Sequence, residues 1–411
     1  MSTSRKTVSF PSPAARPARG HLLIGQSGGA TAVINASLVG AALAAMEAET
    51  IDGIYGARYG IRGVLDGDLL DLRRLPAEMW DILRGTPSAA LGSCRYKLRE
   101  DDPARAVAAL RERGIRYFLY IGGNDSADTA LRLAEAARAL DYDLRVVCVP
   151  KTIDNDLPET DHCPGYGSAA RFLALATRDS ALCTLAMPDH YPVKIIEVMG
   201  RDAGWLAAAS ALCKEREEDP PHLIYFPERP LSDERFLADV SSVHAACGYA
   251  VVVVAETVRD EGGQALGASG SQGTDAFGHP LLGGAAQYLT SLVRDQLGLR
   301  ARFDKPGDLQ RMSSACVSST DRAEAELVGR AAVAAALHGE SGKMVTLVRR
   351  PGSIYSCETG LVDLTKIANA HRPFPSAFVS ASGTDVTPAY HDYALPLVGD
   401  PLPRYVRLPT A

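Results

Sequence analysis

Two short segments of the chain carry glycines and carboxylates at a spacing that suits phosphate chemistry. One reads Gly-Gly-Asn-Asp over residues 122–125, and the other reads Lys-Thr-Ile-Asp-Asn-Asp over residues 151–156. Backbone N–H groups of a glycine turn can face phosphate oxygens, and carboxylates can hold Mg²⁺ or take a proton from a hydroxyl. Together the two segments favour phosphoryl transfer over other reactions.

The second segment supplies two acids for this chemistry. Side chains alternate along an extended chain, so Thr152, Asp154 and Asp156 are expected on one face. Two carboxylates this close suit a pair in which one binds a metal and the other acts as a base. The competing interpretation is a turn that only shapes the loop.

A third glycine segment, Gly-Gln-Ser-Gly-Gly-Ala at 25–30, follows a strand-like run and precedes a helix-like run. It fits an anion held on Gly28, Gly29 and the start of the helix. The same letters fit the nucleophile elbow of serine hydrolases, with Ser27 as nucleophile and a late histidine such as His371 or His391. A plain tight turn is the third interpretation. The Walker A, protein-kinase and HExxH signatures are absent from the sequence.

Further charged residues stand where strand-like runs end. Arg201 follows Met-Gly at 199–200 and can hold a phosphate or sugar hydroxyls, and Glu256 ends the run 251–255. Arg302 and Arg311 can clamp a sugar phosphate with two donors each. Each of these side chains could equally be a solvated surface group, so they gain weight only from their neighbours.

The elements around these segments alternate between strand and helix patterns. We expect strands at 21–25, 51–55, 116–121, 144–149, 193–199, 223–226, 249–255 and 344–348, and helices at 31–48, 104–113, 127–140, 168–185, 205–214, 233–246, 283–297 and 323–337. This order predicts an α/β fold with parallel sheets covered by helices on both faces. Residues 260–279 are expected to form a long mobile loop.

Length and composition narrow the class of protein. A chain of 411 residues predicts two domains, and no apolar run approaches the roughly 18 residues that cross a membrane. The net charge of −6 disfavours nucleic acid as a partner. Residues 1–19 are predicted to be a disordered leader. Eight cysteines without a CxxC pair indicate reduced thiols and a cytoplasmic protein.

Taken in order, these motifs resemble the phosphofructokinase family, over about residues 22–348. The most specific matches are Thr-Ile-Asp-Asn-Asp at 152–156 and Met-Gly-Arg at 199–201. The resemblance implies that Asp154 deprotonates the 1-hydroxyl of fructose 6-phosphate, with Lys151 and Arg201 also catalytic. It implies two doubly wound (Rossmann-like) domains with the active site between them, Mg²⁺ as cofactor, and a homodimer or homotetramer.

The resemblance also assigns the remaining site residues. Substrate binding is expected of Thr152, Asp156, Met199, Gly200, Glu256, Arg302 and Arg311, with Arg302 reaching the substrate of a neighbouring subunit. Pyrophosphate binding is expected of Gly28, Gly29, Arg95, Gly123, Asn124, Asp125 and Lys151, and metal binding of Asp125 and Asp156. The donor domain is predicted at 20–165 plus about 311–355, and the sugar-phosphate domain at 166–310 plus about 356–411.

Two residues indicate pyrophosphate as the phosphoryl donor. Family members that use ATP usually carry Gly-Gly-Asp-Gly and a glycine before Thr-Ile-Asp, whereas this chain has Asp125 and Lys151 there. Asp125 places bulk and negative charge where the α-phosphate of ATP would pass, and Lys151 adds a cation for pyrophosphate. Alternatives are an ATP-dependent phosphofructokinase, the serine hydrolase, and a non-catalytic sugar-phosphate sensor.

Three residues depart from the family pattern. Asn124 replaces a metal-binding aspartate, while Asp308 and Pro192 stand where the family usually has groups near the 6-phosphate. The changes at 192 and 308 leave room for another sugar phosphate, such as sedoheptulose 7-phosphate.

Overall fold

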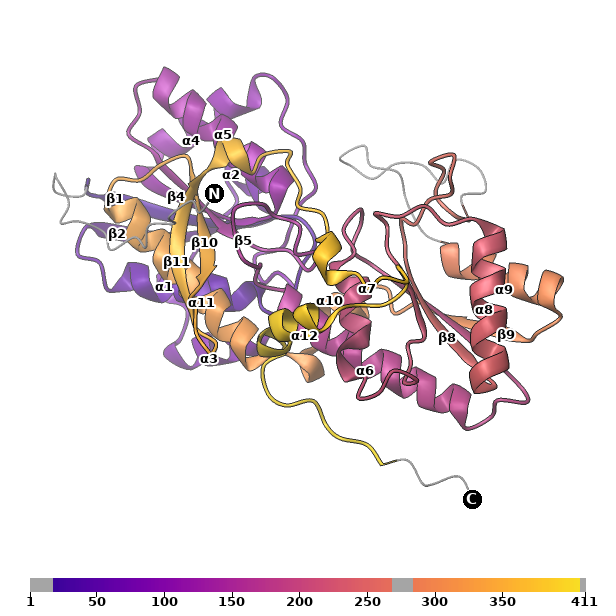
Figure 1. Cartoon of the computed structure of the whole chain (residues 1–411). Coiled ribbons are helices and arrows are strands. Elements are labelled where there is room, and N and C mark those ends of the chain that lie inside the picture. The colour runs from indigo at the N-terminus through magenta and orange to yellow at the C-terminus, as the bar shows by residue number, and fades with distance from the viewer. Residues whose placement is uncertain (1–17, 268–283, 407–411) are drawn as a thin grey trace.

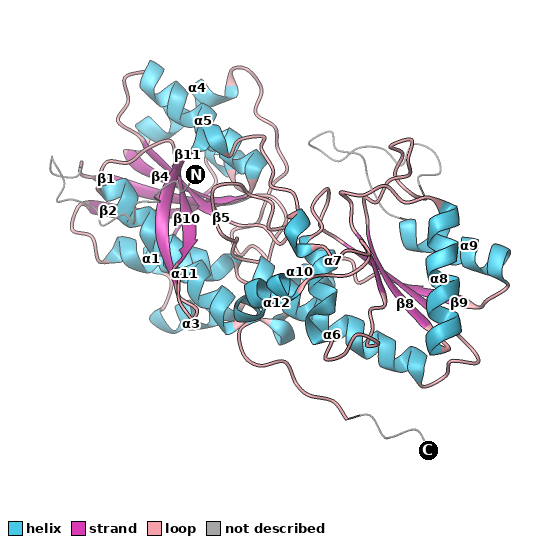
Figure 2. Cartoon of the chain, viewed as in Figure 1, coloured by secondary structure: helices cyan, strands magenta, loops and turns pink. Residues whose placement is uncertain are grey.

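The computed structural model describes residues 18–267 and 284–406, and these form two units side by side (Figure 1). Each unit is built around one sheet, with helices between and around the sheets (Figure 2). The predicted α/β class with parallel sheets is confirmed. Within the described ranges, no helix combines the length and the apolar character that crossing a membrane requires.

The first unit contains a seven-stranded sheet. In spatial order its strands are β11 (Cys357–Asp363), β10 (Lys343–Arg349), β5 (Arg145–Pro150), β4 (Ile115–Gly122), β1 (Gly20–Gln26), β2 (Ile51–Ala57) and β3 (Leu69–Asp71). The pairs β10–β11 and β2–β3 are antiparallel, and the other pairs are parallel. This sheet is therefore parallel in its centre and antiparallel at both edges.

Residues of the central strands face two separate cores because neighbouring side chains point to opposite faces of a sheet. In β4, Tyr117 and Leu119 join one apolar cluster, while Phe118 and Tyr120 join the other. The first cluster is completed by α1 (Ile34–Met46), α3 (Ala77–Gly85) and α11 (Ser319–Leu337); the second is completed by α2 (Ile61–Asp66), α4 (Asp102–Glu112) and α5 (Asn124–Ala139). Burial on both faces explains why these strands read as continuous apolar runs.

The second unit contains a four-stranded parallel sheet. Its order is β7 (Leu223–Tyr225), β8 (Ala250–Ala255), β6 (Val193–Val198) and β9 (Ala301–Asp304), with α6 (Tyr166–Leu185), α7 (Trp205–Ala209), α8 (Asp233–Cys247) and α9 (Ala285–Leu297) around it. The predicted helix at 205–214 is instead α7 followed by a 3₁₀ turn, Ser210–Cys213. The described fold also contains the short helices α10 (Leu309–Met312) and α12 (Pro388–Ala394).

The chain crosses between the units more than once, and one crossing differs from the expected boundary. The sequence suggests that residues after about 356 return to the second unit. Instead β11 pairs with β10 in the first sheet, whereas Tyr390 and Leu397 pack in the core of the second unit. The predicted leader (apart from residues 18 and 19) and most of the predicted loop 260–279 lie outside the described residues.

The order of the first sheet fixes where a ligand can bind. β2 lies on one side of β1 and β4 on the other, so the chain changes direction between β1 and β4. In open α/β sheets ligands bind beside the carboxyl ends of strands at such a switch point. The glycine segments at 25–30 and 122–125 begin at the ends of these two strands.

Candidate active site

A single cleft brings together nearly all of the residues that the sequence singles out. It lies where the loops after β1, β4 and β5 of the first unit meet the loops after β6 and β8 of the second unit. The predicted residues that line it are Gly28, Gly29, Arg95, Gly123, Asn124, Asp125, Lys151, Thr152, Asp154, Asp156, Met199, Arg201, Glu256 and Arg311. Ala30, Thr31, Ser126 and Ile153 also line it and were not predicted.

Two predicted residues are not part of this lining. Gly200 lies between Met199 and Arg201, and its φ of 137° turns the chain so that these neighbours reach the cleft. Arg302 lies on β9, where its guanidinium carbon is 3.3 Å from the centroid of the Tyr191 ring. The predicted contact of Arg302 with a neighbouring subunit's substrate stays a prediction.

The side chains of Lys151 and Arg311 lie close to the glycine loop at residues 25–30. A Cβ atom added to Gly28 would lie 3.1 Å from Nζ of Lys151, and one added to Gly29 would lie 2.9 Å from a guanidinium nitrogen of Arg311. Gly28 also has a φ of 77°, which side chains disfavour. The backbone at position 28 therefore favours glycine, and the loop presents backbone to a space flanked by positive charge, which suits an anion.

The second glycine loop opens helix α5 into the cleft. A Cβ atom on Gly122 would lie 2.0 Å from Oγ of Ser126, so this tight turn also needs glycine. Asp125 lies in the first turn of α5, where the helix dipole favours negative charge. Asn124 accepts a hydrogen bond from the N–H of Asp125 (2.9 Å) and donates its amide to the carbonyl of Ala370 (3.4 Å).

Asp154 has the electrostatic character of a general base. Burial and the neighbouring Asp156 raise the pKa of the Asp154 carboxyl to about 7, although Arg201 acts in the opposite direction. Burial likewise raises the pKa of Asp156. A base works best when its pKa is near the working pH, so Asp154 is suited to take a proton from a bound hydroxyl.

Lys151 is almost fully buried beside these acids, with 4% of its surface exposed. Burial lowers the pKa of its ammonium to about 8, and the carboxylates of Asp154 and Asp156 limit the fall. A buried cation whose solvation has been removed gains from a nearby anion. Lys151 is thus placed to neutralise a phosphate group in the cleft.

The loop between the two acids is held in a left-handed turn. Asn155 has a φ of 54°, a conformation that asparagine tolerates better than most residues. Its side chain accepts a hydrogen bond from the N–H of Cys163 (3.0 Å) and donates one to the hydroxyl of Tyr393 (2.9 Å). The buried amide of Asn155 therefore fixes the direction in which Asp154 and Asp156 point.

The second unit contributes its arginine through a similar turn. Arg201 has a φ of 49°, and its backbone carbonyl accepts a hydrogen bond from the hydroxyl of Thr257. The N–H of Arg201 lies 3.4 Å from Oε1 of Glu256, and Gln310 accepts a hydrogen bond of 3.0 Å from the N–H of Met199. Burial raises the pKa of Glu256. Arg201 and Glu256 together offer a cation and an acceptor, which suits a phosphorylated sugar.

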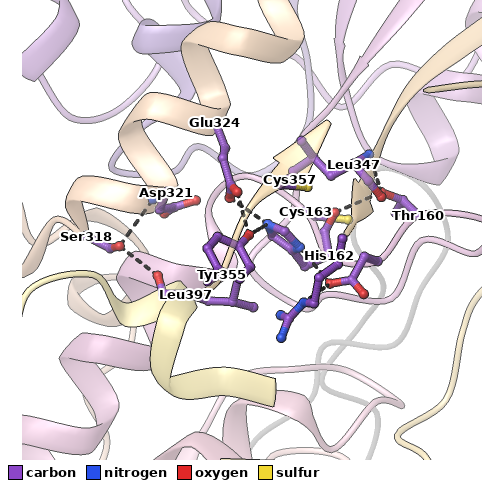
Figure 3. A network of polar contacts seen from close by, with 12 residues as sticks. Thr160, His162, Cys163, Ser318, Asp321, Glu324, Leu347, Tyr355, Cys357 and Leu397 are labelled. Carbon is purple, nitrogen blue, oxygen red and sulfur yellow. Dashed lines mark hydrogen bonds and ion pairs between the residues drawn. The ribbon is translucent and has the colours of Figure 1, made fainter. Parts of the chain in front are cut away.

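A buried polar network contacts the end of the base loop, residues 151–161 (Figure 3). The two ring nitrogens of His162 contact Asp161 (3.0 Å) and Glu324 (2.6 Å), and Tyr355 donates its hydroxyl to Glu324 (2.5 Å). Burial lowers the pKa of His162, but the hydrogen bonds to both carboxylates outweigh it and raise the pKa to about 9. The imidazolium therefore joins the loop to α11.

Three further charged or titratable side chains, Arg349, Tyr355 and Cys357, lie around the pair of His162 with its two carboxylates. Arg349 pairs with the carboxylate of Asp161 at 3.3 Å. The ligand atoms of His162, Glu324 and Cys357 lie within 4.8 Å of one another, but the hydrogen bond between His162 and Glu324 already satisfies both groups. Burial raises the pKa of Cys357 to about 12. The network is thus a structural support, with a neutral thiol at its edge.

Asp321 binds the start of α6, the helix that follows the base loop in the sequence. Its carboxylate accepts hydrogen bonds from the N–H groups of Gly165 (2.8 Å) and Ser168 (2.9 Å) at the start of α6. Asp321 therefore ties α11 of the first unit to α6 of the second.

Ser27, the nucleophile of the hydrolase alternative, does not line the cleft. It is 5% exposed, and its hydroxyl faces Tyr120. His391, one of its suggested partners, belongs to α12 in the second unit. The geometry thus favours a cleft for anions over a serine nucleophile.

Comparison with known proteins agrees with this geometry. Residues 21–336 match the family model described as Phosphofructokinase. The chain belongs to the phosphofructokinase family. This match spans parts of both units and includes every residue expected to bind the substrates or the metal or to act in catalysis.

Two phosphofructokinase relatives carry the same name, pyrophosphate--fructose 6-phosphate 1-phosphotransferase. The protein of Xanthomonas campestris is 41% identical over 95% of this chain and 96% of its own. That of Methylococcus capsulatus is 40% identical over 92% of each chain. A solved structure, the pyrophosphate-dependent phosphofructokinase of Marinobacter aquaeolei, superposes with a TM-score of 0.84 and is 36% identical over 94% of each chain.

Proposed function

We infer that this protein transfers a phosphoryl group from pyrophosphate to the 1-hydroxyl of fructose 6-phosphate, giving fructose 1,6-bisphosphate and phosphate. The names of relatives that match nearly the whole chain support this activity. The observation that carries it in the structure is that Asp125 and Lys151 line the same cleft as Asp154. An acid and a buried lysine there suit a bare diphosphate and disfavour a nucleotide.

We propose that Asp154 takes the proton of the 1-hydroxyl while the sugar oxygen attacks the near phosphorus in line. The bond between that phosphorus and the bridging oxygen breaks, and phosphate leaves. Lys151, Arg95 and the backbone of the loop at Gly28 and Gly29 would hold the donor. Little covalent chemistry is required of the protein in such a transfer, so positioning and charge neutralisation supply most of the rate.

The sugar phosphate is proposed to bind the face of the cleft formed by the second unit. Arg201 and Arg311 are its cations there, and Glu256 is an acceptor for sugar hydroxyls. Met199 of the same unit and Thr152, which follows β5 of the first unit, complete the contact. Asp308 pairs with Arg311 at 2.9 Å. The aspartate does not line the cleft, so it helps to orient the arginine from outside it. The first unit is then the donor domain and the second the sugar domain.

Phosphotransferases of this family generally depend on a divalent metal, and we propose that the metal is Mg²⁺. The cleft offers the oxygen ligands that Mg²⁺ prefers, with Asp125 and Asp156 as the expected ligands. The bound ion would neutralise charge on the donor oxygens. Asn124 is a neutral group, so it is the weaker candidate.

A homodimer or homotetramer is proposed from the position of Arg302 on the edge strand β9. We also propose that the enzyme works in the cytoplasm, because its eight cysteines are free in the described structure. The exchange of a phosphoanhydride for a phosphoester has little driving force, so the reaction is proposed to run in both directions.

Steady-state kinetics with pyrophosphate and ATP side by side tests this function. Each donor is assayed against fructose 6-phosphate and sedoheptulose 7-phosphate, with Mg²⁺ in excess. We expect kcat/KM with pyrophosphate and fructose 6-phosphate to exceed that with ATP by at least about 10²-fold. Equal or better turnover with ATP would remove the basis of the donor assignment, and a preference for sedoheptulose 7-phosphate would reassign the sugar.

A further inference from the structure

Residues 369–374, here called the strap, run without regular secondary structure between β11 and the segment that leads to α12. The sequence gives this segment no recognisable motif. In the structure it makes polar contacts with the base loop and with α5, which begins at the donor loop (residues 122–125). It is linked through Glu228 and Trp205 to the segment that follows Arg201.

The contacts with the base loop are the most extensive. The guanidinium of Arg372 donates to the carbonyl oxygens of Asn155 (2.7 Å), Thr160 (2.8 Å) and Asp161 (2.7 Å). The N–H of Arg372 donates to the carbonyl of Asp156 at 2.5 Å. One residue therefore holds the backbone immediately after Asp154 on two sides and closes the loop 155–161 upon itself.

The strap contacts the donor side through its first two residues. The amide of Asn124 donates to the carbonyl of Ala370 (3.4 Å), and the amide of Asn369 donates to the carboxylate of Asp128 (3.0 Å). Both partners lie on α5, which begins at the donor loop. An aspartate at 124 could not make the first bond because a carboxylate has no N–H to donate.

The last residue of the strap contacts the sugar side. Oε1 of Glu228 accepts hydrogen bonds from the N–H of Phe374 (2.8 Å) and from the N–H of Gly204 (2.9 Å), which directly precedes α7. The guanidinium of Arg372 also lies 4.5 Å from the centroid of a ring of Trp205, the first residue of α7. The strap is therefore linked to the segment that follows Arg201.

We propose that the strap sets the position of Asp154 relative to the donor and sugar sites, with Arg372 as the positioning residue. The inference rests on the proposed function of the cleft, and it goes further because it assigns a role to residues about 200 positions away from the base loop in the sequence. The proposal also gives a reason for asparagine at position 124. Its neutral amide is a weaker metal ligand than a carboxylate, but it donates the hydrogen bond that joins α5 to the strap.

The test is a double-mutant cycle between Arg372→Met and Asp154→Asn, measured with pyrophosphate and fructose 6-phosphate. A residue that acts only through the base loses its effect when the base is removed. We expect Arg372→Met to lower kcat by about 10–100-fold in the wild-type background, since small misplacements of a reacting group are costly. In the Asp154→Asn background we expect a further loss below about 3-fold.

The matched control is Arg178→Met. Arg178 also donates to a backbone carbonyl, that of Pro403 at 2.6 Å, and lies 3.7 Å from the ring centroid of Tyr405, but it does not line the cleft. We expect it to lower thermal stability by an amount similar to Arg372→Met and to leave kcat within about 2-fold of wild type.

Equal losses of kcat from Arg372→Met in both backgrounds would overturn the proposal, as would an equal loss from the Arg178 control. If Arg372→Met does not fold, Arg372→Lys takes its place in the cycle, because one ammonium cannot reproduce the planar fork that reaches three carbonyls. Wild-type protein that is folded but inactive with pyrophosphate would instead count against the proposed function, which separates the two failures.

Discussion

The preference of the cleft for pyrophosphate over ATP is expected to depend on two residues, Asp125 and Lys151. We predict that replacing Asp125 and Lys151 together by glycine makes ATP a usable donor and pyrophosphate a poorer one. The change removes the acid in the first turn of α5 and the buried ammonium beside Gly28. Both groups face the cleft, so their loss alters the charge that a donor meets. Loss of Lys151 also removes a cation that lowers the pKa of Asp154, so kcat with each donor is compared with that of the Lys151→Gly single variant.

The expected size follows from the charges. Two unit charges ~5 Å apart repel by about 3 kcal/mol at an effective dielectric constant of ~20, a value suited to a half-buried cleft. At ~1.4 kcal/mol per tenfold, removing the Asp125 carboxylate is worth about 10²-fold in kcat/KM for ATP. Losing the cation of Lys151 is expected to cost pyrophosphate turnover about 10²–10³-fold, as for other groups that stabilise transition-state charge.

An assay that couples fructose 1,6-bisphosphate to aldolase follows both donors. The variant Asp125→Asn separates charge from bulk, since it removes the charge and keeps nearly the same volume. Glycine in a helix costs about 1 kcal/mol, so thermal unfolding is measured alongside. If the folded double-glycine variant uses ATP no better than wild type does, the idea that these two residues exclude a nucleotide is wrong.

Four further predictions follow from the site. Asp154→Ala lowers kcat by roughly 10²–10⁴-fold, as loss of a general base does; near-normal turnover would show that another group takes the proton. Gly29→Ala, whose Cβ would lie 2.9 Å from the Arg311 guanidinium, displaces that flexible side chain, so KM for the sugar phosphate rises about 10-fold while the melting temperature stays nearly unchanged. The pKa of His162 is about 9 in the folded protein and about 6.5 when unfolded. The free energy that its imidazolium adds to folding is therefore fully present below about pH 6.5 and is lost as the pH rises toward 9. His162→Gln is expected to flatten the pH dependence of the free energy of unfolding across this window, and an unchanged pH dependence would refute the assignment. Chelation by EDTA abolishes turnover, and titration with Mg²⁺ restores it; activity that survives chelation would argue against a metal.

The sequence locates the first unit's site well because its motifs stand at the ends of strongly apolar strands. The strand before Gly122 and the strand before Lys151 are buried on both faces, which makes them visible as continuous apolar runs. Parallel pairing of neighbouring strands then brings their carboxyl ends to one edge of the sheet. For this reason nearly all the predicted residues meet in one cleft.

Elements at the margins could not be predicted because they lack such a pattern. The strand β9 has only four residues, with the exposed Phe303 among them, and β11 is half-buried along most of its length. Edge strands of this kind show neither an apolar run nor a clear alternation. The strap could not be predicted for a different reason. Arg372 binds backbone carbonyls, which every residue has, so the sequence of the base loop does not show that an arginine binds there.

The path of the chain has a consequence for its synthesis. The base, the donor loops and the sugar loops are all translated before residue 312, yet α11, β10, β11 and the segment that ties the loops together come afterwards. Because β11 completes the first sheet and residues of α12 contribute to the core of the second unit, neither unit has all of its parts until these later segments have been made. Each unit is therefore assembled from separate stretches of the chain, so neither unit can be excised as one continuous segment.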